Sequence, residues 1–151
     1  MMEIIRITEI SQCTSENVQR IKELLQQLSE QTSFDEDDLE AILVSEGSHL
    51  FFVYVDEVVA GMLTLGSYRT PTGPKYWIED VVVDTCYRGR SLGRMLVEHA
   101  IGFVKEKNDG GILMLTSSPS RVAANALYQS VGFETKQTNV YKMLFPKKSN
   151  E

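Results

Sequence analysis

The stretch VVVDTCYRGRSLGRML, from Val81 to Leu96, is the most informative part of the chain. An apolar run leads into a basic turn with two glycines, and the residues after the turn have helical spacing. The first backbone N–H groups of a helix have no partner inside the helix and lie at the positive end of its dipole. A strand that enters a helix through such a turn therefore predicts a site for an anion.

Two common nucleotide-binding motifs do not fit this turn. A Walker-type phosphate loop needs a Lys-Ser or Lys-Thr pair directly after its last glycine, and no such pair follows Gly89 or Gly93. A dinucleotide-binding GxGxxG motif lies near the start of a parallel βαβ unit. Here the preceding residues have the pattern of an antiparallel meander, and three residues separate Gly89 from Gly93. The sequence therefore favours another phosphate ligand.

The composition limits the class of protein. With 151 residues, of which 42% are apolar and 24% charged, the chain is long enough for one compact domain but short for two. We expect a single domain over residues 1–146 and a short tail over 147–151. The net charge of −6 argues against a nucleic-acid partner, because proteins that bind nucleic acid usually carry a basic surface.

The sequence predicts neither membrane insertion nor a metal site. Its N-terminus does not resemble an export signal, and no stretch approaches the roughly 20 apolar residues that span a bilayer. We therefore expect a cytoplasmic protein with no membrane partner. Cys13 and Cys86 lie far apart, and only His49 and His99 could join them as soft metal ligands.

Apolar periodicity predicts an α/β (α+β) fold with the order β-α-α-β-β-β-α-β-α-β. We expect a mixed sheet of about six to seven strands, flanked by about four helices. The predicted strands are Glu3–Ile10, His49–Val55, Val58–Tyr68, Lys75–Asp84, Ile112–Thr116 and a strand pair or bent strand over Phe133–Phe145. The predicted helices begin at Ser15 and after the turn at Leu92, and cover Asp35–Ser45 and Pro119–Val131. Gln31–Phe34 is expected to form a loop that reaches a ligand.

The turn Arg88-Gly-Arg-Ser-Leu-Gly93 resembles the R/Q-x-x-G-x-G/A signature of the GNAT superfamily of acyl-CoA-dependent N-acyltransferases. The resemblance begins at Ile78–Asp84 and continues in Arg121-x-x-Ala-Asn-x-Leu-Tyr-x-x-x-Gly-Phe133, so that with the element order it covers nearly the whole chain. It implies a GNAT fold and acetyl-CoA as cosubstrate. Ser91 stands where the family usually has glycine. We expect this position to need only a small side chain rather than a positive φ.

The resemblance also implies which residues hold acetyl-CoA. Backbone N–H groups of the turn bind the pyrophosphate, and the main chain of Val81 and Val83 bonds the pantetheine arm as an added strand would. A rim of arginines lies near the phosphates. The expected cosubstrate-binding residues are Val81, Val82, Val83, Arg88, Gly89, Arg90, Ser91, Leu92, Gly93, Arg94, Asn125 and Tyr128.

Acyl transfer to an amine requires two proton movements. An alkylammonium group with a pKa near 10 is only ~0.1% neutral at pH 7, so a base must take its proton. The resemblance assigns this role to Glu79 first and Asp80 second, with Glu79 on the strand side shared by Val81 and Val83. Tyr128 matches the family tyrosine that protonates the departing thiolate. Surface acids and a core tyrosine remain the alternative readings of these residues.

The sequence also predicts the class of acceptor. By resemblance, the first helix pair, the loop between the third and fourth strands, and the C-terminal strands build its pocket. The candidates are Ser33, Phe34, Tyr68, Arg69, Tyr76, Glu79, Asn139 and Tyr141. Aromatic and acidic side chains favour a primary amine of a small molecule, such as an aminosugar, or of a peptide. A non-catalytic acyl-CoA-binding sensor on the same fold and a homodimer both stay open.

Overall fold

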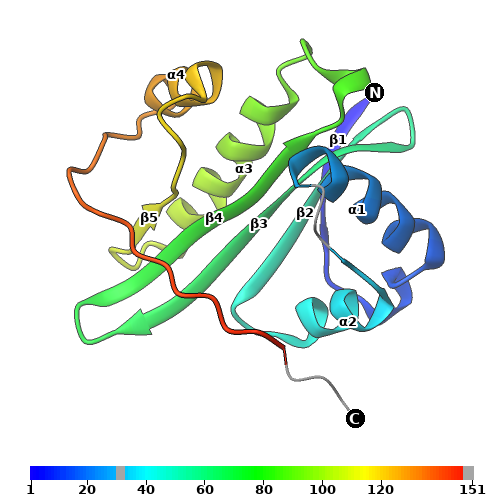
Figure 1. Ribbon diagram of the computed structural model, residues 1–151, viewed down its shortest axis with the longest axis horizontal. Coiled ribbons are helices and arrows are strands. Elements are labelled where there is room, and N and C mark those ends of the chain that lie inside the picture. Colours follow the sequence, from blue (N-terminus) through cyan, green and yellow to red (C-terminus); the bar gives the residue numbers. More distant parts are fainter. Residues whose placement is uncertain (30–32, 148–151) are drawn as a thin grey trace. The chain divides into compact units, whose positions relative to one another are not determined.

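A mixed sheet of five strands organises residues 1–118 in a computed structural model that describes residues 1–29 and 33–147 (Figure 1). The strands lie in the order β1-β2-β3-β4-β5. The first four are antiparallel neighbours, and β5 runs parallel to β4. They are β1 (Met2–Ile7), β2 (Ser48–Val55), β3 (Val58–Thr70), β4 (Gly73–Val83) and β5 (Ile112–Met114). The predicted antiparallel meander is thus confirmed.

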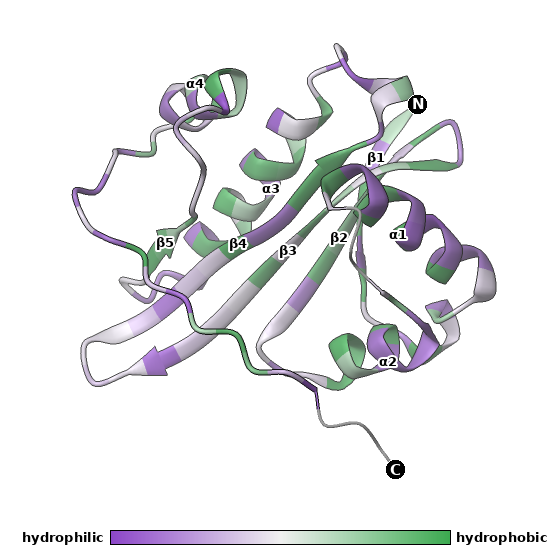
Figure 2. Cartoon of the chain, viewed as in Figure 1, coloured by the Kyte–Doolittle hydropathy of each residue, from purple (hydrophilic) through white to green (hydrophobic). Residues whose placement is uncertain are grey.

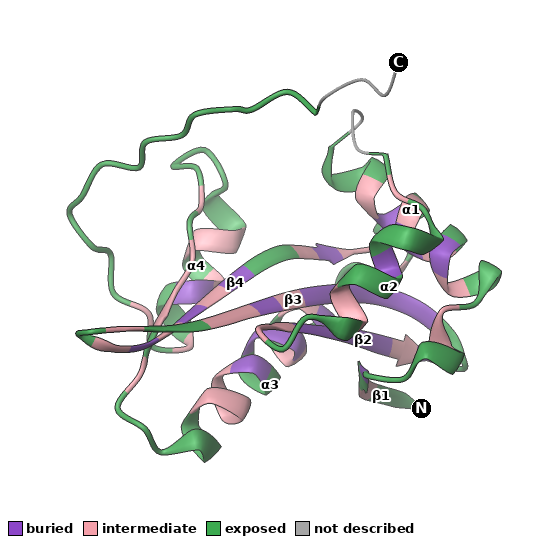
Figure 3. Ribbon diagram, turned by 90° about the horizontal axis from the view of Figure 1, so that it is seen from below, coloured by how far each residue is buried: buried purple, intermediate pink, exposed green. Residues whose placement is uncertain are grey.

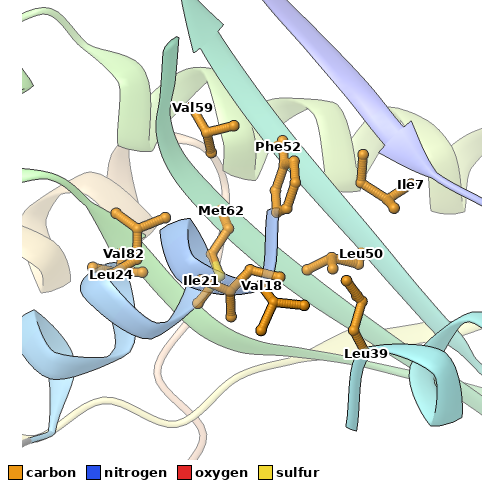
Figure 4. Close-up of a cluster of buried hydrophobic side chains, with 10 residues drawn as sticks. All are labelled: Ile7, Val18, Ile21, Leu24, Leu39, Leu50, Phe52, Val59, Met62 and Val82. Carbon is orange, nitrogen blue, oxygen red and sulfur yellow. The ribbon is translucent and has the colours of Figure 1, made fainter. Parts of the chain in front are cut away.

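Helices lie on both faces of this sheet. α1 (Ser15–Leu28) and α2 (Glu36–Val44) cover one face, and α3 (Leu92–Lys107) covers the other, as the edge-on view shows (Figure 3). α1 buries one apolar side chain per turn and presents a hydrophilic outer surface (Figure 2). The face of the sheet that α1 and α2 cover is called the α1 face. Residues of α1, α2 and the strands β1 to β4 form a buried cluster on it (Figure 4): Ile7, Val18, Ile21, Leu24, Leu39, Leu50, Phe52, Val59, Met62 and Val82.

The starts of α1 and α2 follow from their polar residues. The Thr14 hydroxyl accepts a hydrogen bond from the backbone N–H of Asn17 at 3.1 Å. Asp35 and Asp38 accept reciprocally from each other's backbone N–H groups, at 3.0 and 2.9 Å. These side chains occupy N–H groups that have no partner inside the helix, and the acidic first turn of α2 matches the helix dipole.

Residues 119–151 form a second compact unit, which is described here by itself. Its described part contains α4 (Val122–Ser130), followed by Gly132 with a φ of +112°. Residues 133–147 have no helix or strand, and all but Phe133 are exposed (Figure 3). The predicted strand or strand pair over Phe133–Phe145 is therefore wrong. A strand needs a partner, and the described part of this unit offers none.

The sheet accordingly has five strands rather than six to seven, while the mixed α+β architecture is as expected. The single domain over residues 1–146 stays a prediction. Gln31 and Thr32 of the predicted loop, and residues 148–151 of the predicted tail, lie outside the described residues. None of the helices in the described ranges is long and apolar enough to cross a membrane.

Candidate active site

A β-bulge in β4 determines where the two candidate base residues lie. Between Met62 and Thr64 of β3 lies one residue, but between their partners Val82 and Glu79 of β4 lie two. Asp80 takes up the extra residue with a left-handed φ of +50°. The bulge puts Glu79 on the same face as Val82, which is the α1 face, because partners in register share a face. The expected grouping of Glu79 with Val81 and Val83 is therefore wrong.

Glu79 and Asp80 have the electrostatic character of a proton acceptor. Both residues are exposed overall, but protein atoms around their carboxyl groups displace part of the surrounding water. Partial burial, and to a lesser extent the Asp80 carboxylate, raises the pKa of Glu79 above its usual value. Partial burial also raises the pKa of Asp80. A carboxylate with a raised pKa is a stronger base than one in water, and general bases are commonly tuned in this way.

Two aromatic side chains lie on the same face of the sheet as Glu79. Trp77 pairs with Gly66 and Tyr68 with Lys75, which places both aromatics on the face of Thr64 and Glu79. The indole N–H of Trp77 donates a hydrogen bond to the Tyr68 hydroxyl at 3.0 Å. Phe34, which precedes α2, is partly buried and packs against the core cluster of the same face. The α1 face therefore carries aromatic and acidic groups together.

The edge of β4 beyond Trp77 is open. Among the described residues, β5 pairs with β4 only from Lys75 to Trp77. The Asp84 N–H donates to the Ala60 carbonyl of β3 at 2.8 Å, so alternation turns the main chain of Val83, and of Val81 before it, away from β3. An open edge can accept an extended ligand as an added strand. Val82 instead turns its main chain toward β3 and its side chain into the core cluster.

The turn after β4 contains two residues in the left-handed conformation. A short 3-10 helix, η2 (Thr85–Tyr87), follows β4, and Gly89 and Ser91 then have φ values of +82° and +60°. Ser91 precedes α3 directly, but its side chain makes no capping hydrogen bond. The Ser91 side chain therefore does not occupy any of the N–H groups at the start of α3. Because φ is positive at Ser91, the expectation that this position needs only a small side chain is wrong.

Arginines surround this turn. Arg88 and Arg90 are exposed, and the Arg90 guanidinium carbon lies 5.4 Å from the centroid of the Tyr87 ring. Arg94, on the first turn of α3, places its Nε 2.9 Å from Glu98 Oε1. A Cβ added at Gly89 would meet nothing within 4 Å, so the backbone there is open to a ligand. Positive charge and accessible backbone thus coincide at the start of α3.

Tyr128 lies on α4, in the second unit. It is 7% exposed, and its ring lies edge-on to Phe133 with the centroids 6.1 Å apart. Within residues 119–147, no hydrogen-bond partner is found for its hydroxyl. Asn125 lies one turn earlier on the same helix face.

Two predicted acceptor residues occupy unexpected surroundings. Tyr76 is buried on the α3 face, and its hydroxyl donates a hydrogen bond to Asp109 Oδ2 at 2.6 Å. This placement does not fit substrate binding, and Tyr76 is left out of the proposed site. Tyr141 belongs to the exposed segment after α4 and is 86% exposed. Its role stays a prediction.

The model of the acetyltransferase (GNAT) family matches residues 14–133. The chain belongs to this family. This membership agrees with the resemblance carried by its turn. Among curated proteins, N-alpha-acetyltransferase RimI of Mycobacterium tuberculosis is 39% identical over 75 residues. That match covers 50% of this chain and 43% of the relative, so it spans less than half of the relative's length.

Solved structures of low sequence identity share the fold. An aminoglycoside acetyltransferase from an uncultured soil sample, in complex with sisomicin, has a TM-score of 0.80 at 18% identity and covers 97% of both chains. Glucosamine-6-phosphate N-acetyltransferase from Arabidopsis thaliana has a TM-score of 0.77 at 22% identity, over 96% of this chain and 99% of that one. A third neighbour, aminoglycoside N-acetyltransferase AAC(6')-Iy, was solved with CoA; its TM-score is 0.74 at 17% identity, over 95% of both chains.

Proposed function

We propose that this protein is an acyltransferase that moves the acetyl group of acetyl-CoA to a primary amine of a small molecule or a peptide, by direct attack within a ternary complex. One juxtaposition carries the proposal. The open edge of β4 leads from the carboxylates of Glu79 and Asp80 to the left-handed turn at the start of α3. An extended ligand with an amide arm and a pyrophosphate matches an open strand edge that ends at a helix N-terminus.

The cosubstrate part of the proposal assigns the pyrophosphate to backbone N–H groups between Gly89 and Arg94. The open backbone at Gly89 and the Ser91 side chain, which makes no capping hydrogen bond, support this assignment. Arg88, Arg90 and Arg94 add positive charge, and the main chain of Val81 and Val83 bonds the pantetheine amides. The CoA bound to an aminoglycoside N-acetyltransferase of the same fold is further support. Bound acetyl-CoA supplies an activated acetyl group.

In the proposed reaction, this chain's own groups move two protons. Glu79 accepts the proton of the attacking amine, directly or through water, and its raised pKa suits that task. Asp80 is the second candidate for the same role. Tyr128 donates its phenolic proton to the departing sulfur, which is the role implied by its match to the family tyrosine. Asn125 on the same helix contributes to holding the cosubstrate.

The acceptor in this proposal is cationic and small enough to lie against the aromatic residues of the α1 face. Glu79 and Asp80 attract an ammonium group, and Tyr68 and Phe34 provide apolar contacts. Two kinds of relative support two acceptor classes. The curated relative carries the name N-alpha-acetyltransferase. The structural neighbours include enzymes named for aminoglycosides and glucosamine 6-phosphate.

A two-stage experiment tests the proposal. Acetyl-CoA at 100 times its dissociation constant should stabilise the folded protein by ~2.7 kcal/mol, and NAD and ATP should do much less. Release of CoA is then followed with a panel of aminoglycosides, glucosamine 6-phosphate and peptides with free amines. Equal stabilisation by ATP would contradict the choice of acetyl-CoA. Binding of acetyl-CoA without acetylation of any amine would favour the sensor.

A further inference from the structure

A partly buried ion pair joins α1 to Asp84, the residue that follows β4. Arg20 Nη2 lies 2.6 Å from Asp84 Oδ2, and the two side chains are 17% and 8% exposed. The Nε of Arg20 also donates to the Val59 carbonyl of β3 at 2.6 Å, and its Nη1 lies 2.9 Å from Glu23 Oε2. One guanidinium on α1 is therefore bonded to β3, to the end of β4 and to its own helix.

Asp84 passes this connection on to η2, the short helix that leads into the turn. Its Oδ1 accepts a hydrogen bond from the Cys86 N–H at 2.8 Å, and its carbonyl accepts from the Tyr87 N–H at 2.9 Å. A second α1 residue, Gln27, accepts from the Thr85 N–H at 2.9 Å. All three N–H groups of η2 are therefore held by Asp84 or by α1.

The turn that follows is held mainly at its two ends. Arg88, Gly89, Arg90 and Ser91 are all exposed, and the space around Gly89 is open. At the far end Leu92 is buried at the start of α3. The near end is η2, held by Asp84 and Gln27. A shift of either end would move the N–H groups of the turn.

Net stability alone is a poor explanation for this ion pair. Removing two charges from water costs about as much as their attraction returns, so buried pairs are weak evidence for stabilisation. Burial acts to raise the pKa of Asp84, but hydrogen bonds from Cys86 and Arg20 outweigh it and hold the pKa below its usual value. Asp84 is therefore a carboxylate at neutral pH and can accept from both groups at once.

We propose that Arg20 and Asp84 are positioning residues that hold the turn Arg88–Ser91 in the conformation that receives the pyrophosphate of acetyl-CoA. The inference rests on the function proposed above. Binding a pyrophosphate through backbone N–H groups requires several donors to point at it together. A misplacement of about an ångström is enough to weaken such a site strongly. Arg20 and Asp84 act on the cosubstrate through the backbone and do not touch it.

The test compares acetyl-CoA with a shorter ligand that lacks its nucleotide part, and with it the pyrophosphate. Asp84→Asn keeps the shape of the side chain and an oxygen for the Cys86 N–H, but removes the charge that holds Arg20. We expect Asp84→Asn and Arg20→Met each to raise the dissociation constant of acetyl-CoA about tenfold. The dissociation constant of S-acetylpantetheine, which has no pyrophosphate, should change less than twofold. Calorimetry measures the dissociation constant of acetyl-CoA, and an NMR titration measures that of S-acetylpantetheine.

Two control variants separate positioning from general destabilisation. Ile21→Val removes a buried methyl group from the neighbouring α1 residue and lowers stability without touching the pair. Glu23→Gln removes only the second, more exposed partner of Arg20. Both should leave the binding of acetyl-CoA unchanged. If Asp84→Asn does not fold, Arg20→Lys carries the test, because it keeps the charge but loses the forked geometry.

Hydrogen exchange in the ligand-free protein gives a readout that does not depend on acetyl-CoA. The amides of Cys86 and Tyr87 should exchange at least tenfold faster in Asp84→Asn than in the wild type, because the neutral side chain no longer holds Arg20 and η2 is no longer fixed to α1 through it. They should exchange no faster in Ile21→Val. Unchanged exchange, unchanged binding of acetyl-CoA, or an equal loss of both ligands would each overturn the positioning role. A wild-type protein that does not bind acetyl-CoA would overturn the proposed function, while the exchange data would still report on the pair.

Discussion

Glu79 of β4 lies opposite Thr64 of β3, on the face of the sheet that α1 and α2 cover. It reaches that face because Asp80 adds one residue to β4, in a left-handed conformation that aspartate tolerates better than most residues. A regular strand would place Glu79 on the α3 face instead. The bulge therefore turns the candidate base toward the aromatic residues of the acceptor side.

Glu79→Gln should lower the single-turnover rate of acetyl transfer by about 10²-fold or more, because the amide cannot accept the amine proton. The base acts when deprotonated, so the wild-type rate should rise with pH through the pKa of Glu79. Burial and Asp80 place that pKa above the usual 4.5. The pH profile of Glu79→Gln should lack this limb.

Asp80→Asn supplies the comparison for the base assignment. Loss of the Asp80 charge lowers the pKa of Glu79, so the acidic limb should move to lower pH while most of the rate remains. Asparagine also tolerates the left-handed φ, which keeps the bulge. A larger loss of rate in Asp80→Asn than in Glu79→Gln would assign the base to Asp80.

Ser91→Gly should raise the free energy of unfolding by up to about 1 kcal/mol, because a non-glycine residue in the left-handed region is strained. Urea denaturation measures the change. Ser29 is the control, since it ends α1 with an extended φ of −155°. Ser29→Gly should destabilise slightly through the entropy of the unfolded chain. Equal effects at both positions would show that the turn holds no strain.

Gly93→Val should weaken the binding of acetyl-CoA by about tenfold or more, since a bulky side chain at the start of α3 crowds a phosphate held by the backbone. Gly102 lies in the same helix, and a Cβ there meets nothing within 4 Å. Gly102→Val therefore controls for valine in α3. Calorimetric titration of both variants decides the point, and equal affinities would remove Gly93 from the site.

His49 should make stability fall in mild acid. Burial, with Arg6 and Lys107 nearby, lowers its pKa from 6.5 to about 4. Its Nδ1 accepts from Arg6 Nη2 at 2.8 Å, and its Nε2 lies 3.1 Å from the Ser67 hydroxyl. Between these two pKa values the unfolded chain takes up a proton that the native protein does not. The contribution of His49 to the free energy of unfolding is complete above pH 6.5 and is lost as the pH falls toward 4.

The size of this effect is about 3 kcal/mol at most. His49→Gln should flatten the difference between unfolding free energies measured at pH 4.5 and pH 7. His99→Gln, which removes the other histidine, should keep the wild-type difference. A His49→Gln protein with the full wild-type difference would show that other groups cause the pH dependence.

Much of the fold follows from local patterns. The predicted strand Val58–Tyr68 differs from β3 by two residues at its end, and the predicted helix Asp35–Ser45 contains α2 with one residue to spare on each side. Apolar periodicity and capping residues act over a few positions, so the sequence displays them directly. The basic turn was recognisable for the same reason, because its glycines and arginines are neighbours.

Other features depend on residues that are distant in the sequence. Arg20 and Asp84 are separated by 64 positions, and no local sequence pattern at either residue predicts the pair. The bulge at Asp80 moves Glu79 to the other face of the sheet relative to the valines that follow. Because these are three consecutive valines, the alternation of side chains in the sequence does not reveal this change. The apolar residues near the C-terminus predict a strand, but a strand pattern does not supply a partner strand. Long-range partners therefore account for most of the errors.

Tyr128→Phe separates the catalytic and structural readings of the α4 tyrosine. The substitution keeps the ring and its contact with Phe133 but removes the proton that the proposal gives to the departing sulfur. A general acid typically contributes ~10²–10⁴-fold, so the transfer rate should fall by about that factor while acetyl-CoA affinity and Tm stay close to wild type. A hydroxyl bonded in the core would instead cost about 1 kcal/mol of stability and leave the rate unchanged.

Single-turnover acetyl transfer is the measurement for Tyr128→Phe, because slow product release can hide a chemical defect in kcat. Tyr87→Phe is the matched control: it removes a tyrosine hydroxyl from η2, beside the phosphate turn, and has no part in the proposed proton transfers. Its rate should match the wild type. Protonation by water sets a lower bound on the Tyr128→Phe rate. A folded Tyr128→Phe protein that binds acetyl-CoA and reacts within about threefold of wild type would exclude Tyr128 as the acid, since general acids contribute far more.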